Sequence, residues 1–166
     1  MQLNPIKSYF AALETEYLGY IITRNGIKPQ KKKVEAILNM GIPKTVKQLR
    51  GFIGMVNFYR DSWRRRAHHM APLTKLLSQK KGAIKWNKEA DEAFKKIKEI
   101  CAEDALLFYP NFAQPFEIHT DASEYQMGGV ISQNGNTIAY WSRKLSETQK
   151  RYPTIEQELL AITEIL

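Results

Sequence analysis

The spacing of hydrophobic residues changes near residue 108 and divides the chain into a mainly helical part and a mainly strand-forming part. Before this point, apolar residues recur at the three- and four-residue intervals of a helix face, most clearly within residues 45–63. From Phe116 the interval becomes two, so that alternate residues up to Asp121 lie on opposite sides of an extended segment. Tyr109-Pro110-Asn111 interrupts the helical pattern, and we expect a domain boundary just before it.

The first 27 residues are predicted to form strands. Residues 17–23 are rich in aromatic and β-branched side chains, and Arg24-Asn25-Gly26 is a turn signal because Asn and Gly tolerate a positive φ. Pro29 then opens a helix that ends near Gly41-Ile42-Pro43.

The next helix is expected to begin after Thr45, a good N-cap residue, and to run to about Trp63. One face is an apolar stripe made of Leu49, Phe52, Ile53, Val56 and Tyr59. On the opposite side Arg50, Gly54 and Phe58 line up at four-residue intervals, with Lys47 and Asn57 nearby. Gly54 either opens the helix backbone to a groove or permits close helix packing, and the spacing alone leaves both interpretations open.

Two more helices are predicted to complete a small bundle over residues 28–106. One is short, at about 70–78, and the other follows Trp86 with Asn87 as its cap. The inner face of the longer helix contains Ala90, Phe94, Ile97 and Cys101.

The C-terminal part is predicted to be a three-stranded antiparallel sheet covered by one helix. Residues 128–133 and 137–142 flank the hairpin signal Asn134-Gly135-Asn136. In the last helix, Thr154 and Gln157 are spaced as a capping box. Its apolar stripe is expected to pack on the sheet and consists of Ile155, Leu159, Ile162 and Leu166.

Charged residues are also distributed unevenly between the two halves of the chain. The net charge is +8, but residues 1–81 carry 16 Lys/Arg against 4 Asp/Glu, whereas residues 82–166 carry 9 against 13. Three basic clusters lie within forty residues, namely Lys31-Lys32-Lys33, then Lys44, Lys47 and Arg50, and finally Arg64-Arg65-Arg66. A solvated basic surface would explain one cluster, and three favour contact with nucleic acid.

The remaining composition limits the environment of the protein. A single cysteine, Cys101, excludes an internal disulfide and fits a reducing compartment. No apolar run approaches the roughly 20 residues that span a bilayer, and no signal-peptide pattern is present. We therefore expect an intracellular protein, cytoplasmic or nuclear and not secreted, with no membrane partner.

Two carboxylates suggest a metal chemistry. Asp121 lies at the end of the alternating strand within residues 115–123, and Glu158 lies in the first turns of the last helix. A carboxylate at a strand end and another on a helix packed against it are the ligand type that Mg²⁺ prefers.

Several segments together resemble the reverse transcriptases of gypsy-type LTR retrotransposons. In the N-terminal half they are Y-L-G-Y-I-I-T-R-N-G-I at 17–27, P-K-T-V-K-Q-L-R-G-F-I-G-M-V-N-F-Y-R at 43–60 and A-P-L-T-K-L-L at 71–77. The similarity continues through Trp86, P-F-E-I-H-T-D-A-S at 115–123, Y-W-S-R-K-L at 140–145 and Y-P-T-I-E-Q-E-L-L-A-I at 152–162. It covers essentially the whole chain in the same order.

The resemblance implies three domains: the end of the polymerase palm at 1–27, a thumb at 28–108 and the N-terminal half of a ribonuclease H domain at 109–166. Tyr17, Leu18, Gly19 and Tyr20 correspond to a primer grip, which positions the primer end. The helix with Arg50, Gly54 and Phe58 corresponds to the thumb helix that follows the minor groove. This favours groove access for Gly54, because an A-form-like hybrid has a wide, shallow minor groove.

The resemblance also implies that Asp121 and Glu158 are the first two of four ribonuclease H acids that hold two Mg²⁺ ions. The other two acids lie beyond this sequence, so we expect no stable Mg²⁺ binding and no hydrolysis by this chain alone. The family's Tyr-x-Asp-Asp motif is absent and no adjacent Asp pair occurs, which excludes polymerisation.

The expected fold class is therefore α+β: a β-hairpin remnant, a helical thumb bundle and a partial ribonuclease H-like three-stranded sheet with one helix. One hypothesis is a retrotransposon-derived protein that binds RNA/DNA hybrid or duplex, with Arg50, Gly54, Asn57 and Phe58 in the groove and Lys47, Arg64, Arg65 and Arg66 on phosphates. The alternative is a domesticated, non-catalytic subunit that docks a protein partner at the open sheet edge beside Asp121.

Overall fold

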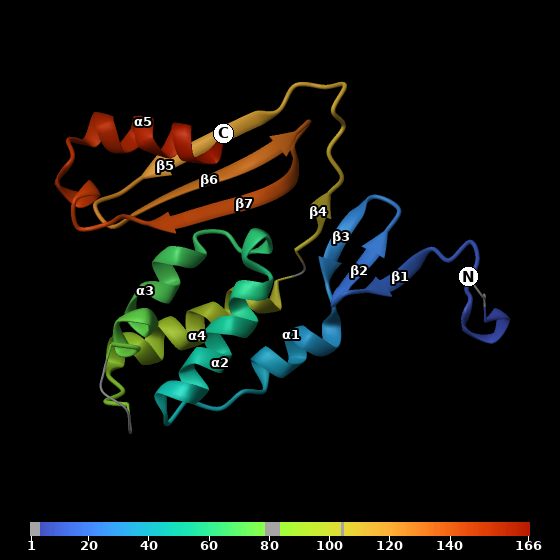
Figure 1. Ribbon diagram of the computed structural model, residues 1–166, viewed down its shortest axis with the longest axis horizontal. Coiled ribbons are helices and arrows are strands. Elements are labelled where there is room, and N and C mark those ends of the chain that lie inside the picture. The colour runs from blue at the N-terminus through green and yellow to red at the C-terminus, as the bar shows by residue number, and fades with distance from the viewer. Residues whose placement is uncertain (1–3, 79–83, 104) are drawn as a thin grey trace.

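The computed structural model describes residues 4–78, 84–103 and 105–166, and within them it contains two antiparallel sheets and five α-helices. A C-terminal layer of three strands, with helix α5 lying across it, stands over a bundle of helices α1–α4 (Figure 1). The small N-terminal sheet lies beside both. The predicted α+β class is confirmed.

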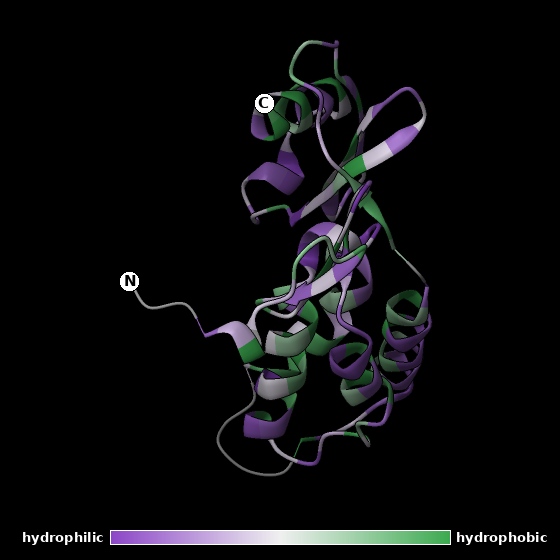
Figure 2. Cartoon of the chain, turned by 90° about the vertical axis from the view of Figure 1, so that its right-hand side faces the viewer, coloured by the Kyte–Doolittle hydropathy of each residue, from purple (hydrophilic) through white to green (hydrophobic). Residues whose placement is uncertain are grey.

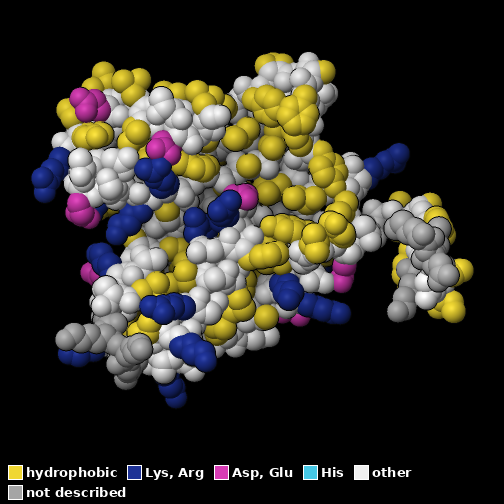
Figure 3. Space-filling view, in the orientation of Figure 1, with side chains coloured by type: hydrophobic (Ala, Val, Ile, Leu, Met, Phe, Trp, Pro, Cys, Tyr) yellow, Lys and Arg dark blue, Asp and Glu magenta, His cyan; other side chains and the backbone are white. Residues whose placement is uncertain are grey.

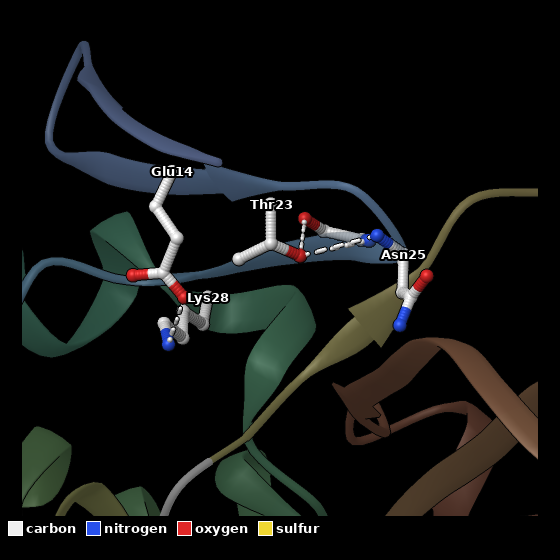
Figure 4. Close-up of polar contacts among 5 residues, drawn as sticks. Glu14, Thr23, Asn25 and Lys28 are labelled. Atoms are coloured by element: carbon white, nitrogen blue, oxygen red, sulfur yellow. Dashed lines mark hydrogen bonds and ion pairs between the residues drawn. The ribbon is translucent and has the colours of Figure 1, made fainter. Parts of the chain in front are cut away.

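The N-terminal sheet is built from β1 (Glu14–Tyr17), β2 (Tyr20–Thr23), β3 (Gly26–Pro29) and β4 (Leu107–Phe108), paired in that order. The turn before β3 is held by Thr23, whose Oγ1 accepts from the backbone N–H of Asn25 at 3.3 Å and of Gly26 at 3.2 Å (Figure 4). Lys28 on β3 forms a 3.1 Å ion pair with Glu14 on β1.

Strand β4 was not predicted, and it returns the chain to the N-terminal sheet after the helices. It approaches so closely that a Cβ added to Gly26 would stand 2.1 Å from the carbonyl oxygen of Leu107. The segment before β1, which contains the short 3-10 helix Pro5–Lys7, extends away from the body (Figure 2). Its apolar side chains Ile6, Tyr9, Phe10 and Leu13 are exposed.

The bundle comprises α1 (Lys31–Leu38), α2 (Val46–Phe58), α3 (Arg66–Leu76) and α4 (Lys88–Ala102). Its core is the stripe predicted for α2 together with residues of the other helices, including Ile37, Trp63, Leu73, Phe94 and Ile97. Cys101 belongs to this core, and burial raises the pKa of its thiol to about 12. Both predicted caps are confirmed, because Thr45 Oγ1 accepts from Gln48 N–H and Asn87 Oδ1 accepts from Ala90 N–H.

Helix α2 ends five residues before the predicted end at Trp63. After Phe58 the chain forms the 3-10 turn Arg60–Ser62 and then starts α3 at Arg66, earlier than predicted. The early end follows from the placement of Trp63, which is buried beside α2 and donates from its indole N–H to the carbonyl of Val56 at 3.3 Å.

The C-terminal layer has strands β5 (Glu117–Ala122), β6 (Gln126–Gln133) and β7 (Asn136–Lys144) in that spatial order. The predicted three antiparallel strands and the hairpin at Asn134 are confirmed. The 3-10 turn Gln149–Arg151 leads into α5 (Thr154–Ile165), which packs on β5 and β6 as expected.

The face of α5 that meets the sheet is not the predicted one. Ile155, Leu159, Ile162 and Leu166 are 70%, 57%, 43% and 85% exposed, whereas Gln157 and Ala161 are buried. The predicted capping box is also wrong, since the N-cap residue is Pro153, with no side-chain cap. The Gln157 amide instead donates to the carbonyls of Gln149 and Lys150, which ties the helix to the preceding turn.

The two main parts of the molecule meet where the arginine-rich turn before α3 touches the C-terminal layer. The backbone N–H of Ala67 donates to Ser142 Oγ on β7 at 3.1 Å, and Arg65 forms an ion pair with Asp121 on β5. Strand β4 also packs against β7. No helix of the described residues is long and apolar enough to cross a membrane.

Candidate nucleic-acid interface and ribonuclease H carboxylates

The primer-grip-like residues form the exposed tip of a tight hairpin. Tyr17 ends β1, Tyr20 begins β2 and the two are paired, with Leu18 and Gly19 as the two-residue turn between them. Both turn residues have a positive φ, 48° and 87°, as a type I′ turn requires. A Leu in this conformation is unusual, and its side chain is held out into solvent.

The hairpin tip is fixed to the C-terminal end of α2. The Tyr59 hydroxyl donates to the Gly19 carbonyl at 2.6 Å, and the Tyr20 hydroxyl donates to the Phe58 carbonyl at 3.1 Å. The rings of Tyr20 and Phe58 stack with centroids 5.6 Å apart. Burial raises the pKa of both tyrosines, so both hydroxyls stay protonated as donors at neutral pH. Tip and helix therefore present one continuous surface.

The outer side of α2 is open along its length. Lys47, Arg50, Gly54, Asn57 and Phe58 are all exposed. A Cβ added at Gly51 or Gly54 would meet nothing within 4 Å, so close helix packing, one of the two interpretations of Gly54, does not apply within the described residues. A hollow of about 380 Å³ lies over these glycines, bordered by Lys33, Met55 and Phe58.

The three neighbouring arginines lie in three different environments. Arg64 is exposed, whereas Arg66 is half-buried and donates to Asn57 Oδ1 through a short hydrogen bond. Burial, with the nearby Arg60 charge as a smaller cause, lowers the pKa of Arg66. Arg65 has a φ of 50° and its guanidinium lies 3.2 Å from Asp121 Oδ2. Figure 3 shows Lys and Arg side chains along the boundary between the C-terminal layer and the helices.

The two ribonuclease H-like carboxylates lie on elements that pack together. Asp121 is on β5 and exposed, and Glu158 is half-buried on α5. Asp121 lines a hollow of about 110 Å³ together with Arg64, Arg65 and His119, and Glu158 is not among its lining residues. Within the described ranges no three His, Cys, Asp or Glu residues are grouped to hold a metal ion. The described residues therefore do not bring together a complete set of Mg²⁺ ligands.

The contact between Arg65 and Asp121 was not predicted. The two residues are 56 positions apart, and sequence reasoning assigned one to phosphate and the other to metal. The signal that hinted at their meeting was only the opposite charge of the two halves of the chain. His119 is exposed beside them.

Comparison with known proteins places this architecture in a family. Residues 86–166 match the RNase H-like domain found in reverse transcriptase. The chain is 39% identical to the retrovirus-related Pol polyprotein from transposon opus of Drosophila melanogaster, over 98% of the chain and 18% of that protein. It is 35% identical to the Pol polyprotein from transposon gypsy of the same organism, again over 98% of the chain and 17% of the relative.

Solved structures show the same fold. The foamy viral protease-reverse transcriptase in complex with RNA/DNA hybrid superposes with a TM-score of 0.85 and 24% identity, over 96% of this chain and 22% of that one. The complex of that viral protein with dsDNA gives a TM-score of 0.83 at 24% identity, over 93% and 33% of the two chains. This chain spans less than a fifth of the Pol polyproteins it matches. It belongs to the gypsy-type Pol polyprotein family and corresponds to its reverse transcriptase–ribonuclease H region.

Proposed function

We propose that this chain binds RNA/DNA hybrid or duplex nucleic acid, with the hairpin tip and the outer side of α2 as the contact surface. The observation that carries the proposal is the open backbone at Gly51 and Gly54, flanked by exposed Arg50 and Phe58. A helix without side chains at these positions can approach the wide, shallow minor groove of an A-form-like duplex. The foamy viral complexes with dsDNA and RNA/DNA hybrid support the same partner class.

The charge distribution gives this surface its affinity. Lys47 on α2 and Arg64 in the turn that follows it are exposed, and we expect them to contact backbone phosphates. Lys and Arg contacts to phosphate release counterions, so binding of this kind weakens steeply with salt. The division into a palm remnant, a thumb and a partial ribonuclease H domain is part of this proposal. We also expect the protein to work inside the cell, in the cytoplasm or nucleus.

Hydrolysis is assigned to the parent family and not to this chain alone. Asp121 and Glu158 are the family's first two acids, and two carboxylates leave a pair of Mg²⁺ ions short of ligands. We therefore expect no cleavage of a hybrid by the 166-residue chain. A product that appears with the unmodified chain and disappears in Asp121→Asn would contradict this.

The test is fluorescence anisotropy of a labelled RNA/DNA hybrid, titrated with the protein at low and physiological salt. Arg50→Glu is expected to weaken binding by roughly tenfold and to reduce the slope of log K against log salt by about one. Lys88→Glu makes the same charge change on α4, outside the proposed surface, and serves as the matched control. An Arg50→Glu slope equal to that of the control would refute the groove assignment.

A second function rests on α5. Its outward apolar stripe and the outer edge of β5, which pairs only with β6 among the described residues, offer a docking surface for a protein. We propose this non-catalytic, domesticated role as the alternative. It requires that the isolated chain be oligomeric or unstable, and a stable monomer in sedimentation would count against it.

A further inference from the structure

The arginine-rich turn before α3 is built to present one side chain to the C-terminal layer. Arg66 is held by Asn57, and the N–H of Ala67 is held by Ser142 on β7. Arg65 lies between Arg64 and these fixed neighbours, in a left-handed conformation that L-residues rarely adopt. This backbone directs its guanidinium onto Asp121 of β5.

The resulting ion pair is open to water and therefore weak. The Arg65 and Asp121 side chains are 57% and 66% exposed, and their charged atoms are 3.2 Å apart. Exposed ion pairs of this kind contribute little net stability and exchange partners readily. A guanidinium binds a phosphate through the same forked geometry that it uses for a carboxylate.

We propose that Arg65 is an exchange switch: in the free protein it neutralises Asp121, and when nucleic acid binds it moves to a backbone phosphate and releases Asp121. The inference deepens the proposed function and rests on it. It gives the turn a role beyond general affinity, because a polyanion that draws Arg65 away removes the counter-charge from the carboxylate that the family uses in its ribonuclease H site. The hollow shared by Arg64, Arg65, His119 and Asp121 is where the incoming phosphate would lie.

The exchange predicts a specific coupling in hybrid affinity. Asp121→Asn removes the competing carboxylate and is expected to tighten hybrid binding about two- to fivefold, the size of an exposed ion pair. In an Arg65→Ala background, Asp121→Asn should raise the hybrid affinity no more than the control substitution Glu124→Gln does. Ala at position 65 carries the same left-handed backbone restriction as Arg, so the turn is retained.

The matched control is Glu124→Gln, which removes the same charge from an exposed residue three positions along. Its gain in affinity reflects long-range repulsion of a polyanion and should be equal with and without Arg65. A gain from Asp121→Asn that is equal in both backgrounds would overturn the exchange.

A second readout does not depend on hybrid binding. The NMR signal of the Arg65 Nε–H, identified by its loss in Arg65→Lys, should shift in Asp121→Asn and stay in place in Glu124→Gln. Titration with inorganic pyrophosphate should also shift the wild-type signal, because the guanidinium exchanges the carboxylate for a phosphate. No shift in Asp121→Asn, or none with pyrophosphate, refutes the switch. Absence of hybrid binding with both shifts present refutes the groove proposal and leaves the phosphate exchange intact.

Discussion

The helical bundle and the C-terminal layer both contain a helix with a clear apolar stripe, but one stripe is buried and the other is exposed. In α2 the stripe is the core, with Leu49, Phe52 and Val56 fully buried. In α5 the stripe faces outward and the small or polar side, with Ala161 and Gln157, meets the sheet. A helical period therefore identifies an apolar face, but the surrounding layers decide whether that face is the one buried.

The difference also appears in the amount of core on each side. Among the described residues, the bundle buries fifteen hydrophobic side chains in one cluster, whereas the cluster of the C-terminal layer contains Met127, Leu145 and Ala161. Because burial of apolar area dominates folding stability, the bundle is expected to stabilise itself far better than the C-terminal layer. The C-terminal layer is then the part that gains most from a further covering surface on α5.

The largest effect that sharpens this comparison is expected from Phe52→Ala. Phe52 is fully buried and the centroid of its ring lies 4.6 Å from that of the Phe94 ring, so the change should lower the free energy of unfolding by about 3–5 kcal/mol. Phe112→Ala, at an exposed position, is the control and should change it by less than about 0.5 kcal/mol. Urea denaturation measures both, and similar values would mean that the bundle does not hold the main core.

Two substitutions on α5 test which face is buried. Ala161→Leu overpacks the sheet-facing side and should cost about 1–3 kcal/mol, whereas Leu159→Ala removes an exposed side chain and should cost less than about 0.5 kcal/mol. Thermal unfolding of the two variants makes the comparison. A cost for Leu159→Ala above that for Ala161→Leu would show that the stripe is covered in solution, by a second copy or another part of the protein.

Glycines in the C-terminal layer and in the bundle differ in the space around them. A Cβ at Gly129 on β6 would stand 2.4 Å from Ile165 Cδ1 and 3.1 Å from the His119 carbonyl, so Gly129→Ala should destabilise by about 1–3 kcal/mol. Gly54→Ala has free space, and better helix propensity should stabilise by about 0.5–1 kcal/mol.

We expect Gly54→Ala to have opposite effects on hybrid affinity and on stability. If the open backbone of α2 lies in a groove, the added methyl group should weaken hybrid binding while the melting temperature rises. Unchanged affinity with raised stability would remove Gly54 from the interface. Gly51→Ala, which also meets open space, tests whether the contact extends one turn toward the start of the helix.

Local signals in the sequence were sufficient for much of the fold. Thr45 and Asn87 cap helices as predicted, and Asn134-Gly135 turns a hairpin, because each acts on its own neighbours in the chain. Strand β4, the end of α2 at Phe58 and the orientation of α5 were missed. Strand β4 and the orientation of α5 depend on contacts with distant segments, and the end of α2 depends on how Trp63 packs in the core. Hydrophobic periodicity encodes neither.

The candidate site shows the same limit. The residues of α2 that we propose to face the groove could be named because they repeat along one helix. The pair between Arg65 and Asp121 could not, since it depends on a left-handed turn and on how two parts of the molecule meet. The family resemblance does not predict this ion pair either, because it assigns Asp121 to a metal ion and does not indicate an arginine beside that carboxylate.

The smallest effect concerns one turn type that occurs in the N-terminal sheet and again in the C-terminal layer. Leu18-Gly19 and Asn134-Gly135 are two-residue hairpin turns whose residues all have a positive φ, with 48° at Leu18 and 51° at Asn134. Asn adopts this conformation readily and Leu does not. Leu18→Asn should therefore stabilise the chain by about 0.5–1 kcal/mol, and Asn134→Leu should destabilise it by a similar amount, as measured by thermal unfolding.

The hybrid affinity of Leu18→Asn tests whether the strained Leu18 at the hairpin tip contacts nucleic acid. Its side chain is exposed and contributes little to the core, so strain without a partner has no structural benefit. If the tip contacts a primer strand, Leu18→Asn should weaken hybrid binding while raising stability, and Asn134→Leu should leave binding unchanged. A Leu18→Asn variant that is both more stable and equally tight would show that the tip does not touch nucleic acid, and the contact surface would then be reduced to α2 and the basic turn.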